Sequence, residues 1–291
     1  MLPQRLVFVF LLISLAACTS APSPEIIPED TATPVPSATP VASIPPTATL
    51  VPTQTAVPPA TPIPQEETLP PADGVVAFYS DRDGNPDIYT MNADGSNATR
   101  LTNDPAFDDS PAISPDGTKI VFLTARHDPS PSFPNLKYEI YVMDIDGSNP
   151  RRLTETDAAE DHPAWSPDGS RIIFDADYDG DGFYEIYTMN ADGTELTRLT
   201  SNAANDQFAD WSLDGTQIAF SSDRNGNWDI FVMDADGSNQ RALTDSPNWE
   251  LFPAWSPDGT QIVFNGLAPR SRNTDVFVMN ADGGDFRGDV R

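Results

Sequence analysis

The sequence is poor in the residues that many enzymes and most nucleic-acid-binding proteins need. It has one cysteine, two histidines and only 16 Lys and Arg against 44 Asp and Glu, so its net charge is −28. That charge repels phosphate backbones and argues against nucleic acid as a partner, and a single cysteine cannot form an internal disulfide. The sequence also lacks the G-x-S-x-G, H-E-x-x-H and glycine-rich phosphate-binding motifs. We therefore expect a protein without catalytic activity.

No apolar run is long enough to cross a bilayer. The longest, residues 6–17, follows Arg5 and has the length of a signal-peptide core. It runs into LAAC at residues 15–18, which resembles the lipobox of bacterial lipoproteins, whose cysteine is lipidated. We therefore expect residues 1–17 to be a signal peptide and Cys18 to be the only membrane contact, a lipid anchor. The exported protein would then sit on the outer side of the cytoplasmic membrane, in the periplasm or at the outer membrane; ordinary signal-peptide cleavage is the alternative.

The next segment, residues 18–72, contains 15 prolines among Thr, Ala, Ser and Val. Proline removes backbone donors and favours extended polyproline II conformations, so this composition predicts a disordered Pro/Thr-rich stalk. The folded domain is then residues 73–291, which carry all but five of the acidic residues.

The domain consists of one unit repeated five times. Its clearest element is DIYTMNADG at residues 87–95, which recurs with small changes at 139–147, 185–193, 229–237 and 275–283. A second element, PAWSPDG at 163–169, has counterparts at 111–117, 209–215 and 253–259, and a short apolar run such as RIIF follows each. A third element, RLT or ALT, follows four of the five Asp-Gly turns.

Each full unit predicts four short strands joined by tight turns, because β-branched and aromatic runs alternate with Asp-Gly pairs whose glycine accepts a positive φ. Four-stranded units of about 45 residues repeated around an axis are propeller blades. The expected fold is all-β, a β-propeller of about five four-stranded blades, with the methionine of each repeat in the core.

Closure of the propeller is expected to be imperfect. The first repeat lacks its inner strand. Residues 284–291 are expected either to form the outer strand of the last blade or to return as the inner strand of the first. A pseudo-six arrangement and closure by a dimer are the alternatives.

The string PAWSPDG, IVF, DIYVM, ADG and RLT resembles the repeats of the TolB-like propeller family over residues 74–285. This resemblance implies the propeller fold and a place in a cell-envelope system of the Tol-Pal kind. The chain departs from TolB in two ways. TolB has an N-terminal α/β domain where the stalk stands here, and it has six blades where five repeats are present here.

Two groups of residues are candidates for binding. Acidic residues precede the inner strands at a fixed offset, where the repeat predicts a partial ring: Asp108, Glu160, Asp206 and Glu250. Such a ring would suit a cation or a cationic group, although we favour hydrogen bonds that every blade needs equally. Trp249 and Trp228 break the repeat pattern and are candidates for contact with a partner, whereas Phe208 and Phe252 are expected to pack between blades.

One loop resembles a calcium loop. The stretch DADYDGDGFYE, residues 175–185, spaces its acids so that their oxygens can converge on one ion: Asp175, Asp177, Asp179, Asp181 and Glu185. A twelve-residue EF-hand count ends on Ile186 instead of glutamate, and the flanks predict strands. A hairpin stabilised by Asx turns is therefore the alternative, and calcium is the only cofactor that the sequence suggests.

Together these features predict a non-catalytic, membrane-tethered, extracytoplasmic propeller that binds or scaffolds a protein partner in the cell envelope. One alternative is a Tol-Pal-like transport or integrity component. The other is a propeller enzyme or carbohydrate-binding module acting on cell-surface polysaccharide, with a glycan as ligand. The strongly acidic charge argues against an enzyme that acts on acidic polysaccharide.

Overall fold

The computed structural model describes residues 74–128, 136–267, 274–285 and 287–288, and every regular element within these ranges is a β-strand. The expected signal peptide, Cys18 and the stalk lie outside the described residues. Within the described ranges, no helix is both long and apolar enough to span a membrane.

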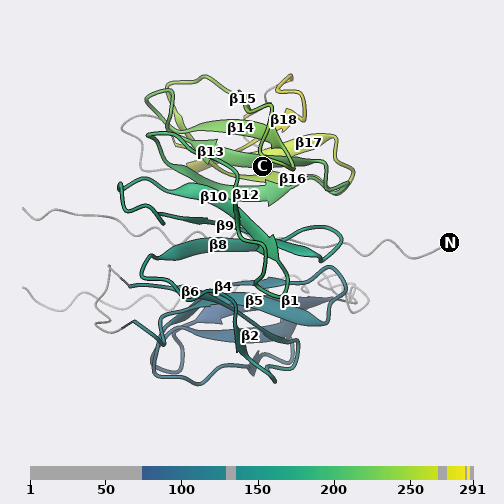
Figure 1. Cartoon of the computed structure of the whole chain (residues 1–291). Helices are drawn as coiled ribbons and strands as arrows, with labels where there is room; N and C mark the ends of the chain where they lie inside the picture. The colour runs from purple at the N-terminus through teal and green to yellow at the C-terminus, as the bar shows by residue number, and fades with distance from the viewer. Residues whose placement is uncertain (1–73, 129–135, 268–273, 286, 289–291) are drawn as a thin grey trace, which may run out of the picture. The chain divides into compact units, whose positions relative to one another are not determined.

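The strands form five antiparallel sheets, which are the five blades of a β-propeller in chain order (Figure 1). Blade 1 contains β1 (Val75–Ser80), β2 (Asp87–Asn92) and β3 (Thr99–Arg100). Blade 2 contains β4 (Asp108–Ile113), β5 (Lys119–Thr124), β6 (Glu139–Asp144) and β7 (Arg151–Arg152). Blade 3 contains β8 (Glu160–Trp165), β9 (Arg171–Ala176), β10 (Glu185–Asn190) and β11 (Thr197–Arg198). Blade 4 contains β12 (Asp206–Trp211), β13 (Gln217–Ser222), β14 (Asp229–Asp234) and β15 (Arg241–Ala242). Blade 5 contains β16 (Trp249–Trp255), β17 (Gln261–Leu267), β18 (Thr274–Asn280) and β19 (Arg287–Gly288).

The predicted repeat is confirmed as a four-stranded meander in blades 2 to 5. Blade 1 has three strands in the described residues and no inner strand. Of the two expected places for the C-terminal residues, the structure shows the first, because β19 pairs with β18 as the outer strand of blade 5.

In blades 2 to 5 successive blades pack through their inner strands, β4 against β8, β8 against β12 and β12 against β16, and in blade 1 the edge strand β1 packs against β4. No packing of similar extent joins blade 5 to blade 1 in the described ranges. These two blades lie at opposite ends of the row of sheets in Figure 1.

The two ends of each blade differ in what they present. At the mouth end, as we call it, the inner and third strands begin, and Asp206, Ser222 and Asp229 lie across from one another in blade 4. We call the opposite end the turn end, because it carries the tight turns that follow the inner and third strands. These turns include residues 212–216 in blade 4.

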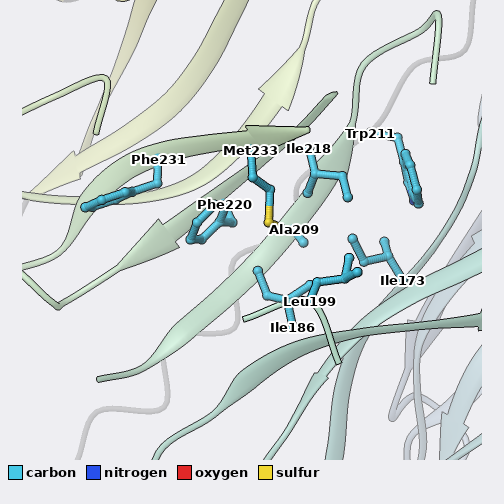
Figure 2. Close-up of a cluster of buried hydrophobic side chains, with 9 residues drawn as sticks. All are labelled: Ile173, Ile186, Leu199, Ala209, Trp211, Ile218, Phe220, Phe231 and Met233. Carbon is cyan, nitrogen blue, oxygen red and sulfur yellow. The ribbon is translucent and has the colours of Figure 1, made fainter. Parts of the chain in front are cut away.

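The hydrophobic core lies between blades rather than within one sheet. Figure 2 shows one such cluster, to which blade 3 contributes Ile173, Ile186 and Leu199 and blade 4 contributes Ala209, Trp211, Ile218, Phe220, Phe231 and Met233. Met91 of blade 1 is partly exposed, whereas the methionines of the four-stranded blades are buried, as the repeat predicts: Met143, Met189, Met233 and Met279. Full burial of one such large apolar side chain is worth about 1.5 to 3 kcal/mol, so each blade depends on its neighbour for stability.

The turns bring neighbouring blades into close contact. Gly237 has a φ of 86°, and a Cβ built there would lie 2.7 Å from the carbonyl oxygen of Leu199 in blade 3. Only glycine satisfies both the left-handed backbone and this distance.

Candidate functional site

Each inner strand has a bulge near its start. Its register with the second strand shifts between residues 109 and 112, 161 and 164, 207 and 210, and 251 and 254. Within each bulge one residue has a positive φ: Ser110 (47°), His162 (50°), Phe208 (59°) and Phe252 (57°). Such angles are uncommon for residues other than glycine. We therefore attribute them to the bulge, which imposes this backbone conformation on the four residues.

Three of these bulge residues meet near the mouth end. The ring of Phe208 lies 4.3 Å from that of His162 and 4.0 Å from that of Phe252, between centroids. The three rings come from three successive blades. With the carboxylates of Asp161 and Asp175, they form what we call the mouth cluster.

Asp175 organises this cluster. Its side chain is completely buried. It accepts hydrogen bonds from His162 Nδ1 (3.1 Å) in its own blade, and from Gln207 Nε2 (3.1 Å) and the backbone N–H of Phe208 (3.2 Å) in the next. A buried carboxylate with this many donors is a fixed structural anion that joins blade 3 to blade 4.

His162 is held as a cation. Burial alone lowers its pKa, but the negative charges of Asp161 and Asp175 outweigh burial and raise the pKa to about 9. For Asp161, burial raises the pKa to about 6 in spite of the neighbouring imidazolium. At neutral pH the His162 ring therefore carries its proton and is a poor acceptor for general-base chemistry.

Aromatic side chains surround the mouth cluster. Tyr138, Tyr184 and Trp228 each stand one residue before the acid that opens a third strand, and all three are partly exposed. Trp228 lies 6.2 Å from Phe208 between ring centroids. Burial, together with the charges of Asp161 and Asp175, raises the pKa of Tyr184 to about 12, and burial followed by nearby acids also raises the pKa of Tyr138. The mouth thus combines partly exposed aromatic rings with one buried carboxylate, Asp175, and one partly exposed carboxylate, Asp161.

The predicted acid ring also lies at the mouth end, but its side chains are buried inside the blades. Its four side chains are at most 1% exposed: Asp108, Glu160, Asp206 and Glu250. In the best-defined case the Thr154 hydroxyl, at the end of blade 2, accepts from the backbone N–H of Ile140 (2.8 Å) and donates to Glu160 of blade 3 (3.0 Å). These carboxylates bind side chains of the protein itself. We therefore assign them to joining and bracing blades rather than to a ligand.

The two predicted tryptophans lie close to each other. The backbone N–H of Glu250 donates to the carbonyl of Trp228 (2.8 Å), which places Trp249 beside it. Trp249 is 50% exposed. Both indoles are therefore at the mouth end, and Trp228 reaches the mouth cluster.

The structure divides the predicted calcium ligands. It brings carboxylate oxygens of Asp177, Asp179 and Asp181 within 4.8 Å of one another. The other two predicted ligands have protein partners instead. Asp175 accepts a hydrogen bond from His162, and Glu185 forms an ion pair with Arg198. Arg198 also forms an ion pair with Asp179 (2.7 Å).

Two of the three clustered carboxylates also serve the backbone of their own loop. Asp177 accepts from the N–H groups of Gly180 (2.8 Å) and Gly182 (3.0 Å), and Asp181 accepts from that of Phe183 (2.9 Å). The loop is thus a hairpin stabilised by Asx turns in which Arg198 already supplies a cation.

The fold and the mouth cluster together define a five-bladed propeller with an aromatic, acidic mouth. Residues 135–228 match the model of the tricorn protease N-terminal β-propeller domain. The chain is 37% identical over 106 residues to a TolB homologue of Chlorobaculum tepidum, covering 36% of this chain and 22% of that protein. It is 37% identical over 68 residues to dipeptidyl-peptidase 5 of Porphyromonas gingivalis, covering 22% of this chain and 9% of that enzyme.

Among solved structures, the putative TolB of Agrobacterium tumefaciens superposes with a TM-score of 0.60 at 26% identity, covering 73% of this chain and 79% of that one. The described domain is a β-propeller that is similar in sequence and fold to TolB propellers. The chain spans less than a third of the length of the curated relatives it matches.

Proposed function

We propose that this protein is a non-catalytic binding module of the cell envelope, which holds a protein partner at the mouth end of its propeller. The observation that carries the proposal is the group of partly exposed aromatic side chains around the mouth cluster, Tyr138, Tyr184 and Trp228. Tyrosine and tryptophan that are partly desolvated beside fixed polar groups are typical anchors of protein interfaces.

Two further features support a binding role. In its protonated state His162 does not serve as a general base at this mouth. The similarity to dipeptidyl-peptidase 5 extends over only 9% of that enzyme, so it carries no inference about peptidase activity. The acidic residues of the domain favour a partner that presents a basic segment. The proposal also includes export and a lipid anchor at Cys18. These two features are inferred from the sequence alone.

The proposal is tested by affinity capture from a cell-envelope extract of the source organism, with the full-length mature protein as bait. The double variant Tyr184→Ala, Trp228→Ala should lose a partner that the parent retains. The matched control is Leu213→Ala, because Leu213 is 60% exposed but lies at the turn end. Equal recovery by parent and double variant, or recovery of no protein at all, would refute a mouth-end binding role.

A further inference from the structure

A cavity of about 580 Å³ lies at the turn end, between blades 2 and 3. Blade 2 supplies the turn after β4 and the strands β5, β6 and β7, and blade 3 supplies the end of β8 and two turns. Its volume is in the range of small-molecule sites. The cavity is separated from the mouth cluster by the length of the strands, so it is independent of the function proposed above.

Trp165 gives the cavity an aromatic wall. Its indole Nε1 donates to the carbonyl of Ala112 in blade 2 (3.0 Å), which fixes the side chain across the boundary between the two blades. The corresponding tryptophans of blades 4 and 5 differ. In the described structure the ring nitrogens of Trp211 and Trp255 have no hydrogen-bond partner, and Trp211 is only 7% exposed.

Acceptors around this wall are held in fixed positions. Asp116 accepts from the Ser114 hydroxyl (2.6 Å) and the backbone N–H of Thr118 (3.0 Å). Asp168 has the same arrangement in blade 3. Its hydrogen bonds lower its pKa to about 2, and the one from the Ser166 hydroxyl has the largest effect. Both side chains are therefore ionised at neutral pH, with lone pairs left for a ligand's hydroxyl groups.

Donors alternate with these acceptors. Lys119 binds Asp144 (2.9 Å) with half of its side chain exposed, and Asn149 donates to the same carboxylate (2.7 Å). Arg151 donates from Nη1 to the backbone carbonyl of Asp192 across the cavity (2.8 Å). A ligand with many hydroxyl groups can both give and receive hydrogen bonds along this rim.

We propose that the cavity binds a neutral saccharide unit of a surface glycan. A sugar ring has an apolar C–H face that suits an indole, and its edge of hydroxyl groups suits a rim of fixed donors and acceptors. Four carboxylates line the cavity against two cationic side chains, which disfavours an anionic sugar. The clustered carboxylates that are spaced to share a metal ion lie in the loop at residues 177–181, outside this cavity.

The test measures binding of the full-length protein by calorimetry to neutral oligosaccharides, N,N′-diacetylchitobiose and maltotriose among them, with trigalacturonate as the anionic comparison. At least one neutral sugar should bind, and trigalacturonate should bind more weakly. Trp165→Ala should weaken that binding by about tenfold or more, equivalent to at least about 1.4 kcal/mol. Trp255→Ala, which truncates the same repeat position in blade 5, should leave it unchanged.

A second variant keeps the proposal testable if Trp165→Ala does not fold. Arg151→Thr installs the residue that the repeat has at Thr197, so it should fold and still bind the sugar several-fold more weakly. Three results would overturn the proposal: no neutral sugar binding at millimolar concentration, binding that neither Trp165→Ala nor Arg151→Thr weakens, or Trp165-dependent binding of a basic peptide in place of sugar.

Discussion

Raising the pH through 9 should destabilise the domain, because His162 then loses the positive charge that interacts with the carboxylates of Asp161 and Asp175. The folded-state pKa is about 9 against an ordinary value of 6.5. A raised pKa means that the stabilisation is fully present below about pH 6.5 and disappears as the pH rises past 9. Each pKa unit corresponds to about 1.4 kcal/mol, so the rise is worth at most about 3.4 kcal/mol.

The side chain of His162 is 29% exposed, so solvent screens part of this energy. Allowing for that screening, we expect a total loss of about 2 to 3 kcal/mol across the whole titration, of which at most about 2 kcal/mol falls between pH 7.5 and 9.5. For a domain of this size a loss of about 2 kcal/mol lowers the melting temperature by about 4 to 8 °C.

The assay is thermal unfolding of the parent, His162→Gln and His127→Gln between pH 7.5 and 9.5. This window avoids most of the titration of Asp161 (pKa about 6) and Glu185 (pKa about 7), both raised by burial. The parent and His127→Gln should lose stability along the same steep slope. His162→Gln should be less stable at pH 7.5 and much less sensitive to pH. Equal slopes for the parent and His162→Gln would refute the charged state assigned to this histidine.

Two other predictions concern turns and loops. Gly237→Ala should lower the free energy of unfolding in urea by at least about 2 kcal/mol, since it adds a clash with Leu199 to the strain of a positive φ. Gly226→Ala, which has a positive φ but open space around it, should lower it by about 1 kcal/mol. Equal losses for the two variants would contradict the close approach of Gly237 to Leu199. Calcium should leave the melting temperature unchanged, because Arg198 and loop N–H groups already bind the clustered carboxylates. A melting temperature that rises with calcium, falls again with a chelator and no longer responds in Asp177→Ser would instead show a metal site.

The blades could be predicted from the sequence because the repeat states the same local rule several times. β-branched runs define the strands, Asp-Gly pairs define the turns, and the three-stranded first blade follows from a missing PAWS element. These features depend on neighbours in sequence, so a single chain is enough to reveal them.

The mouth cluster could not be predicted in the same way. It depends on bulges that turn His162, Phe208 and Phe252 into left-handed conformations, which the residue types themselves disfavour. Asp175 looks like a loop acid in the sequence, yet the structure buries it under a histidine. Tyr138 and Tyr184 could have been found from the sequence, since each stands one residue before a third-strand acid, but the effect of acids from other strands on their pKa values appears only in three dimensions.

The three-stranded sheet of blade 1 has a mechanical consequence. Any pull transmitted along the chain from its N-terminal side reaches Gly74 and then β1, an edge strand that pairs with β2 alone in the described structure. Its first residue, Val75, is 51% exposed. Force applied at Val75 would separate β1 from β2 one residue pair at a time, starting at Val75, because only the β1–β2 pairing holds β1 in its sheet. Blade 1 is therefore expected to yield before the blades that carry the mouth cluster, and to leave that cluster assembled under a moderate load.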